Sequence, residues 1–342
     1  MKKLLLFLAS LLIGIALFIW IGKAIGWQEI KSAFLAFTGW QGIVILAVTL
    51  LIILIGNWKW LEILKGEGVE ISFRGLLRPY VAGFSVMFLA PVLFWGGEVL
   101  RGYILKKRNA VPWTKGMSSI IIDRILEWTT NLIVIFLGVL IFLSIIGLPP
   151  AKIALIFGGA FLIFASGITY FYFKAFKRES VVEIILRMFG LKRLGEKSAI
   201  IKTEQEIFNF FKYKKKSLGK VFGLSLLRAG MAYLRVWLLI LFLGKKIALI
   251  PALSVLGFTY LAAMIPIPTA LGSHEVLQTL AFSSLGLGAS TAAAFTMLIR
   301  GAELIFALVG MTVLFRLGIS ILKNTFLEKL NNFTGDKNEV SP

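Results

Sequence analysis

Pro91-Val-Leu-Phe-Trp-Gly-Gly-Glu98-Val-Leu100 and Pro268-Thr-Ala-Leu-Gly-Ser-His-Glu275-Val-Leu277 are two versions of one pattern, in which proline precedes glutamate by seven positions. Arg124-Ile-Leu-Glu127 follows the first version and Arg300-Gly-Ala-Glu303 follows the second, 176 positions later. Proline and glycine interrupt helices, so each stretch predicts a break in an apolar segment. Paired broken segments in the two halves of a membrane protein indicate a transporter's substrate site.

The composition predicts an all-α polytopic membrane protein. Of 342 residues, 58% are hydrophobic, and the mean hydropathy is +0.89. About 20 apolar residues are needed to span the hydrocarbon core. Long uncharged runs of this kind recur along the chain, and we expect spanning helices at about 4–22, 40–60, 117–146, 151–173, 218–243 and 289–313.

The charged and reactive residues exclude several classes of protein. The chain has no cysteine and one histidine, so disulfides, thiol nucleophiles and clusters of histidine metal ligands are excluded, and we expect no metal and no cofactor. The net charge of +20 comes from Lys and Arg in loops beside membrane helices. There they set orientation and attract anionic headgroups, so we expect lipid rather than nucleic acid as the partner.

The N-terminus begins Met1-Lys2-Lys3 and continues as a long apolar run. A cleavable signal would have a shorter apolar core and a small-residue cleavage site. The sequence shows no such site, so we expect a retained first helix.

Two further segments, 76–108 and 247–287, are broken into halves of roughly 12 to 18 residues, which are too short to cross comfortably. Loop 174–220 carries thirteen Lys and Arg, and loop 101–116 is also basic, so both are expected to be cytoplasmic. Segment 76–108 then enters and returns from the cytoplasmic side. If the C-terminal tail is cytoplasmic, segment 247–287 enters and returns from outside.

These assignments predict six spanning helices plus two re-entrant hairpins in an inverted repeat, with halves 1–146 and 151–313 and both termini cytoplasmic. Residues 1–320 form a single integral membrane domain, and 321–342 form a cytoplasmic tail that is disordered from 331. Lys245-Lys246 would lie outside, which argues against this topology. Eight simple spans are the alternative.

Loop 174–220 carries apolar residues at helical spacing, around 181–189 and 200–211. An apolar face beside a basic flank is typical of helices that lie in the membrane interface. A cytoplasmic helical hairpin fits the same pattern, and the sequence leaves both open.

Charged residues inside membrane segments are expected to be functional and to need partners. Arg124 and Glu127 stand at i, i+3, as do Arg300 and Glu303, and they either clamp the hairpins structurally or serve transport. The clamp hypothesis pairs Arg124 with Glu98 and Arg300 with Glu275. The charge network is expected to contain Glu98, Asp123, Arg124, Glu127, His274, Glu275 and Glu303.

Arg228 and Arg235 share one helix face at i, i+7, and their own helix offers them no carboxylate. We therefore expect an anionic ligand, or the otherwise unpaired Asp123, to balance them.

The helix breaks predict anion sites as well. Gly96-Gly97 and Gly272-Ser273 open half-helices, whose N-termini expose unpaired N–H groups with positive partial charge. The alternative is that Glu98 and Glu275 cap these termini. His274 is expected to cap or hydrogen-bond rather than to carry protons.

The motifs Gly96-Gly97-Glu98-x-x-Arg101 and Pro268–Glu275, with Arg300 in the last span, resemble the transmembrane region of lysylphosphatidylglycerol synthases, the flippase half of the bacterial multiple peptide resistance factor. The resemblance covers about 1–320 and implies lipid translocation across the cytoplasmic membrane. The family's Pro-Gly-Gly is replaced by Pro268-Thr269-Ala270, which has less backbone freedom. The aminoacyl-transferring domain is not in this sequence, so lysyl-lipid synthesis is not expected.

The favoured function is a flippase for an anionic phospholipid or a polyprenyl-phosphate-type lipid, and not an enzyme. The expected headgroup site consists of Arg228, Arg235, Arg101, Arg300, Gly96, Gly97, Gly272 and Ser273. The alternative is a membrane-embedded transferase acting on a lipid-linked substrate, although no catalytic motif supports it. A partner-binding membrane scaffold is a third hypothesis. A homodimer, and a link to a glycosyltransferase or lipid-modifying enzyme, stay open.

Overall fold

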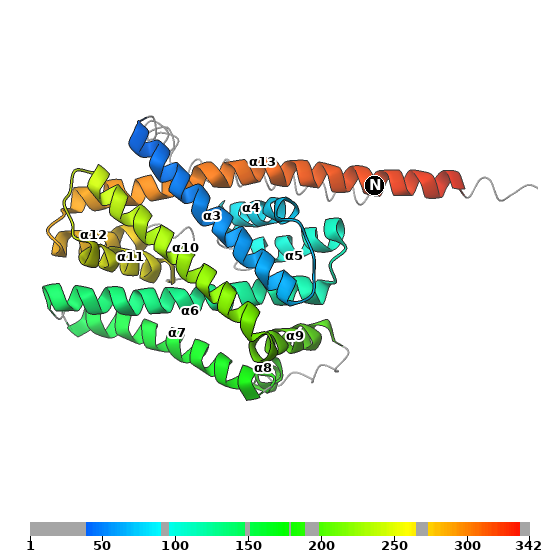
Figure 1. Cartoon of the computed structure of the whole chain (residues 1–342), viewed down its shortest axis with the longest axis horizontal. Helices are drawn as coiled ribbons and strands as arrows, with labels where there is room; N and C mark the ends of the chain where they lie inside the picture. The colour runs from blue at the N-terminus through cyan, green and yellow to red at the C-terminus, as the bar shows by residue number, and fades with distance from the viewer. Residues whose placement is uncertain are drawn as a thin grey trace, which may run out of the picture.

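The structure is a computed structural model that describes residues 39–89, 96–147, 151–177, 179–188, 198–264 and 273–335, and these residues form helices and short connections (Figure 1). The prediction of an all-α polytopic membrane protein is confirmed. The expected first span, 4–22, lies outside the described residues. The helices are α3 (Trp40–Gly66), α4 (Phe73–Leu89), α5 (Gly96–Asn109), α6 (Trp113–Ile146), α7 (Ala151–Lys177), α8 (Val181–Met188), α9 (Ala199–Tyr213), α10 (Lys215–Phe242), α11 (Leu249–Met264), α12 (Ser273–Ser284) and α13 (Ala289–Gly335).

Four of the described helices are long and apolar enough to cross a membrane: α3, α6, α10 and the Ala289–Arg316 part of α13. The shortest, α3, has 27 residues, which at about 1.5 Å per residue exceeds a hydrocarbon core of about 30 Å. These helices coincide with four of the expected spans, and α7 coincides with a fifth. The helix α13 continues to Gly335, and disorder at the end of the tail stays a prediction.

The helices α4 and α5 form an antiparallel hairpin. Gly83 packs against Gly97 and the Arg101 side chain, while Gly75 near the start of α4 lies close to Asn109 at the end of α5. The two helices have 17 and 14 residues, so neither reaches across a core of about 30 Å. The same holds for α11 and α12, with 16 and 12 residues. These lengths argue against eight simple spans.

The packing of the helices follows an inverted repeat. The set α3–α6 corresponds to the set α10–α13: α4 packs along α13 and α11 packs along α6, while α5 and α12 each pack on the long helix that follows them. The helices α3 and α10 lie antiparallel, because Trp40 meets Phe242 at 5.1 Å between ring centroids and Gly66 lies against Ser217 at the other end. The two hairpins therefore occupy opposite ends of the bundle (Figure 1).

Small residues bring the two sets into close contact. Gly138 on α6 faces Gly257 on α11, and Gly310 on α13 faces Ser85 on α4. The Ser85 hydroxyl donates to the Ala307 carbonyl oxygen at 2.6 Å. In a membrane, where lipid is as apolar as a leucine side chain, helices associate through such close packing and interhelical hydrogen bonds.

The basic segment 174–220 contains the two predicted helical stretches, α8 and α9. The apolar face of α9, which includes Ile207, Phe208, Phe210 and Phe211, is buried. It packs with Ile122 and Ile125 of α6 and Val221 of α10. This apolar face is therefore covered by protein rather than by lipid, which favours the helical hairpin over helices that lie in the membrane interface.

Glu67 joins the end of α3 to the start of α6. Its carboxylate accepts a hydrogen bond from Ser118 Oγ at 2.6 Å, and its backbone carbonyl accepts one from Lys115 Nζ at 2.8 Å. Burial raises the pKa of Glu67 from its ordinary 4.5 to about 8; nearby Glu206 raises it further, while Ser118 and Lys115 oppose the shift. The carboxyl group is thus protonated in the folded protein at pH values where an unfolded chain has lost the proton.

Replacing Gly310 by Ala should destabilise the contact between α4 and α13. A Cβ at Gly310 would lie 2.0 Å from Ser85 Oγ and 2.4 Å from the Val81 carbonyl oxygen, so the helices must separate. We expect a loss of about 1–3 kcal/mol, measured by unfolding in detergent. Gly230→Ala on α10 is the matched control, because a Cβ there meets nothing within 4 Å. Equal stability of the two variants would contradict this packing.

Glu67→Gln should remove a pH dependence of stability. In the wild type the folded state holds a proton that the unfolded state releases between pH 4.5 and about 8, so stability falls as pH rises through that range. Melting temperatures in detergent across pH 5 to 8.5, roughly the window of this shift, test this. The melting temperature of the variant should change less with pH than that of the wild type. An equal decline in both proteins would show that Glu67 does not cause this pH dependence.

Candidate functional site

Asp123 on α6 is buried between two cations. Its Oδ1 lies 2.8 Å from Lys59 Nζ on α3, and its Oδ2 lies 3.3 Å from Arg101 Nη2 on α5. Lys59 also donates to the Asp123 backbone carbonyl at 3.2 Å. All three side chains are at most 3% exposed, so this cluster is deep in the protein.

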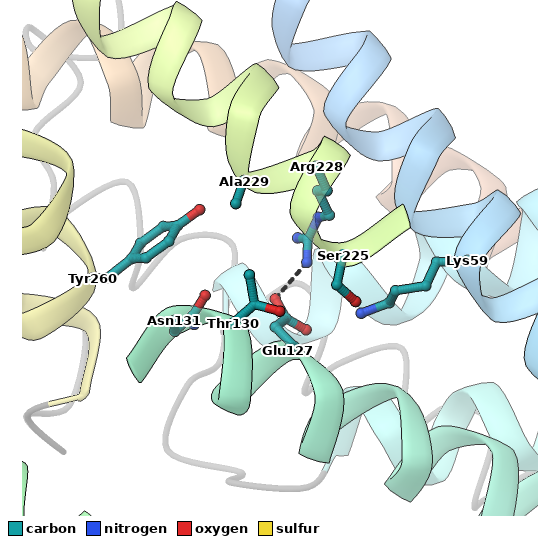
Figure 2. A pocket seen from close by; sticks show the side chains of 8 residues that line it. All are labelled: Lys59, Glu127, Thr130, Asn131, Ser225, Arg228, Ala229 and Tyr260. Carbon is teal, nitrogen blue, oxygen red and sulfur yellow. Dashed lines mark hydrogen bonds and ion pairs between the residues drawn. The ribbon is translucent and has the colours of Figure 1, made fainter. Parts of the chain in front are cut away.

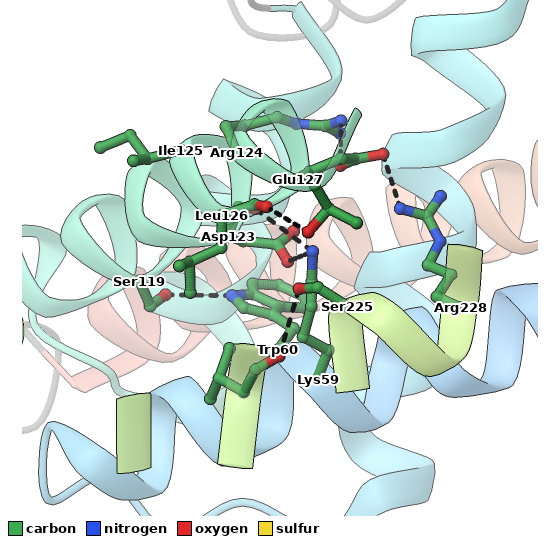
Figure 3. A network of polar contacts seen from close by, with 12 residues as sticks. Lys59, Trp60, Ser119, Asp123, Arg124, Ile125, Leu126, Glu127, Ser225 and Arg228 are labelled. Atoms are coloured by element: carbon green, nitrogen blue, oxygen red, sulfur yellow. Dashed lines mark hydrogen bonds and ion pairs between the residues drawn. The ribbon is translucent and has the colours of Figure 1, made fainter. Parts of the chain in front are cut away.

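Arg101 is held by aromatic rings as well as by Asp123. Its guanidinium lies 3.9 Å from the centroid of the Trp60 ring and 4.8 Å from that of Tyr80. Trp60 is fixed in turn, because its indole N–H donates to Ser119 Oγ at 3.0 Å (Figure 3). The guanidinium of Arg101 is thus enclosed by Asp123, Trp60 and Tyr80, and its assignment to the headgroup site stays a prediction.

Glu127, one turn further along α6, binds an arginine with each oxygen. Its Oε2 lies 2.8 Å from Arg124 Nη1, and its Oε1 lies 2.6 Å from Arg228 Nη1 on α10 (Figure 3). Arg124 also reaches Glu98 at the start of α5, where Nε lies 2.9 Å from Oε1. The predicted clamp between Arg124 and Glu98 is therefore present, and the Arg228–Glu127 pair joins the two halves.

A second cluster lies further along α10. Arg235 Nη2 is 2.9 Å from Glu303 Oε1 on α13, and Arg235 Nη1 donates to Thr49 Oγ1 on α3 at 3.3 Å. Arg228 and Arg235 thus each have a carboxylate from another helix. This corrects the expectation that a ligand or an unpaired Asp123 must balance them.

A narrow pocket opens beside Arg228, between α3, α6, α10 and α11 (Figure 2). Its lining is mostly polar or charged: Lys59, Glu127, Thr130, Asn131, Ser225, Arg228, Ala229 and Tyr260. The Tyr260 hydroxyl approaches from α11, on the far side of the pocket from Lys59 (Figure 2). The open space is about the size of one water molecule, so a larger ligand requires the surrounding helices to move apart.

Three of the pocket residues, Lys59, Glu127 and Arg228, belong to an ion-pair network that has an excess of positive charge. The ion pairs join four cations, Lys59, Arg101, Arg124 and Arg228, to three carboxylates, Glu98, Asp123 and Glu127. With all groups ionised, this set of described residues carries one net positive charge. An uncompensated charge inside a membrane protein is costly, and an anion in the pocket would neutralise it.

The two helix breaks are described to different extents. The helix α5 begins at Gly96, and Gly97 is buried against the Gly83 carbonyl oxygen, so Gly97 permits close helix packing. Gly272 lies outside the described residues, as do the side chains of Ser273 and Glu275. The helix α12 begins at Ser273, with His274 half-buried in its first turn. Pairing of Arg300 with Glu275 stays a prediction. Among the described residues no group of three or more potential metal ligands lies together.

Sequence reasoning missed Lys59. It placed this residue at the edge of a span ending at 60, whereas α3 continues to Gly66 and Lys59 is fully enclosed. Lys59 precedes Arg235 by 176 positions, the spacing that relates the two Arg-x-x-Glu motifs. That spacing was the signal that could have identified it.

The profile of the family described as lysylphosphatidylglycerol synthase TM region matches residues 7–310. The chain belongs to this family. A UPF0104 membrane protein of Methanocaldococcus jannaschii is 26% identical over 266 residues, covering 75% of this chain and 77% of the relative. A UPF0104 membrane protein of Pyrococcus horikoshii is 26% identical over 323 residues, covering 88% and 92%. No solved structure matches the chain.

Asp123→Asn should destabilise the protein more than Glu98→Gln. Loss of the Asp123 charge leaves Lys59 and Arg101 buried without a carboxylate, at a cost of about 3–5 kcal/mol. Loss of the Glu98 charge leaves Arg124 paired with Glu127, so the cost should be about 1–2 kcal/mol.

Unfolding in detergent measures both losses. Lys65→Gln is the control, because that side chain is 52% exposed and its ion pair with Glu62 should contribute less than about 1 kcal/mol. Equal losses for Asp123→Asn and Glu98→Gln would show that Asp123 does not hold the two cations together.

Proposed function

We propose that this protein is a flippase that moves a lipid with an anionic headgroup across the membrane and that the headgroup enters the pocket at Arg228. The observation that carries the proposal is the net positive charge of the ion-pair network to which the pocket residues Lys59, Glu127 and Arg228 belong. Arg228 is the accessible member, with 26% of its side chain exposed, whereas Arg101 is enclosed. A guanidinium fork suits a phosphate group.

The surroundings of Arg228 support a lipid rather than a water-soluble anion. Leu226 and Leu227 precede it on α10 and are exposed, and Ile133 and Phe136 are exposed on α6 close to the pocket residue Asn131. In a membrane such side chains face lipid tails. A lipid can therefore place its headgroup at Arg228 while its acyl or prenyl chains remain in hydrocarbon.

Glu127 lowers the free-energy cost of replacing the Arg228–Glu127 ion pair by an ion pair between Arg228 and phosphate. When a phosphate binds Arg228, Glu127 remains bound to Arg124 through its other oxygen. The carboxylate is then not left buried without a partner, which would cost several kcal/mol. We propose transport rather than a transferase reaction because each carboxylate of the network already holds a cation and none is directed at the pocket without one.

Loop charge supports an orientation with the α3–α10 end that contains Gly66 and Ser217 on the cytoplasmic side. The ends of α5 and α13 point the same way, and α9 ends beside the start of α10 at this end of the bundle (Figure 1). Basic residues gather there, including Lys106, Lys107, Arg108, Lys212, Lys214, Lys215 and Lys216. Basic loops stay on the cytoplasmic side. In this orientation the α4–α5 hairpin re-enters from the cytoplasm and the α11–α12 hairpin from outside.

Arg228→Gln should slow flipping of an anionic lipid at least about tenfold, because the charge that receives the phosphate is lost. Arg228→Lys should have an intermediate rate, since a point charge replaces a fork. The assay uses proteoliposomes and tail-labelled fluorescent phosphatidylglycerol, with phosphatidylcholine as the uncharged comparison. A labelled polyprenyl phosphate in a separate arm distinguishes the two lipid classes.

Arg108→Gln is the matched control, because Arg108 is exposed at the end of α5 and should not affect the rate. Each variant is checked for folding by its melting temperature. If folded Arg228→Gln flips the anionic lipid at the wild-type rate, the headgroup does not use this pocket. If wild-type protein flips neither anionic lipid, the transport function itself is wrong.

A further inference from the structure

Three polar residues of the first half have counterparts in the second half at a constant spacing of 176 positions. Thr49 corresponds to Ser225, Lys59 to Arg235, and Glu127 to Glu303. In each pair the chemistry is kept: a hydroxyl, a cation and a carboxylate. These residues lie on α3 and α6 in one half and on α10 and α13 in the other, which are the helices that the inverted repeat relates.

The antiparallel packing of α3 and α10 turns this spacing into two similar sites. Arg235 faces Thr49 across the helix pair, and Lys59 lies with Ser225 around the pocket. Both hydroxyls donate to the carbonyl one turn earlier, Thr49 to Ile45 at 2.7 Å and Ser225 to Val221 at 3.1 Å. Each hydroxyl oxygen is thereby directed to accept a hydrogen bond from across the interface.

The two sites differ in state. At the second site Arg235 bonds directly to Thr49 at 3.3 Å and to Glu303 at 2.9 Å, so the cation closes the interface. At the first site the pocket lies among Lys59, Ser225 and Glu127, and Lys59 is turned toward Asp123. Ile299 occupies the position of the second half that corresponds to Asp123. The first site is therefore open, with a pocket among its residues, and the second site is closed by direct bonds between the corresponding residues.

Tyr260 of α11 lines the pocket of the first site. Lys59 and Thr49 are ten positions apart on α3, or about 15 Å along the axis. That distance is about half of a hydrocarbon core of about 30 Å.

We propose that the α3–α10 interface holds two quasi-equivalent sites for an anionic headgroup, one at Lys59, Ser225 and Glu127 and one at Arg235, Thr49 and Glu303, and that the lipid crosses as the two sites exchange their open and closed states. The proposal rests on the proposed function and adds the second site. It requires that residues of the closed site, which do not touch the present pocket, matter for transport as much as their counterparts do.

The first test compares matched hydroxyl variants in the same proteoliposome assay with fluorescent phosphatidylglycerol. Thr49→Val and Ser225→Ala each remove one hydroxyl and keep every charge, so both proteins should fold. We expect each to slow flipping about fivefold, the effect of one lost hydrogen bond. Arg235→Gln should slow flipping as strongly as Lys59→Gln, with Arg108→Gln again as the control.

The outcomes separate this proposal from the proposed function. If Arg228→Gln stops flipping while folded Thr49→Val and Arg235→Gln both flip at the wild-type rate, one site is sufficient and the second site is wrong. If wild-type protein does not flip anionic lipid, the proposed function fails instead. Slowing by both members of each matched pair supports two sites.

A disulfide tests the exchange of states directly. The chain has no cysteine, and a Cβ at Gly66 would lie 3.1 Å from Ser217 Cβ and 2.7 Å from Phe210 Cε2. After a small shift of the Phe210 ring, Gly66→Cys with Ser217→Cys should form a bond that holds the interface in its present state, with the first site open. We expect the oxidised protein to lose at least about tenfold in flipping rate and a reducing agent to restore it, because both sites must open in turn. Full activity of the oxidised protein would overturn the exchange.

Discussion

The two ion pairs of the Glu127 carboxylate connect the halves of the protein. The carboxylate binds Arg124 of its own helix with one oxygen and Arg228 of the opposite half with the other. Through Arg124 it connects to Glu98 and thus to the broken segment, and through Arg228 it connects to the pocket. Inside a membrane a charge without a partner is expensive, so any movement of the two halves must supply each of these groups with a new partner.

The inverted repeat would give the proposed movement two end states. Corresponding helices of the two halves make corresponding contacts, and close approaches at Gly138 with Gly257 and at Gly310 with Ser85 are placed at similar points of both halves. The helices of the two halves pack symmetrically, whereas their side-chain bonds differ. We propose that the two halves exchange these side-chain arrangements at a small cost in free energy. The bonds of Arg235 to Thr49 and the pocket beside Lys59 are such an asymmetric pair.

Much of this could be predicted from sequence, because it depends on local signals. The helix break before Glu98, the bond between Arg124 and Glu98, and the two repeats follow from proline, glycine and charge spacing. The partners of Arg228 and Arg235 could not be predicted, since they come from α6 and α13, and their choice depends on how distant helices pack. Lys59 was missed for another reason: hydropathy fixes the end of a span only to within a few residues, and α3 extends six residues beyond the expected end.

Cryo-electron microscopy of the protein in nanodiscs that contain an anionic phospholipid would locate the headgroup. We expect headgroup density within hydrogen-bond distance of Arg228 and beside Lys59, with Glu127 still bound to Arg124. Density for the headgroup elsewhere on the protein, with the Arg228–Glu127 pair intact and the pocket as narrow as it is here, would contradict this expectation.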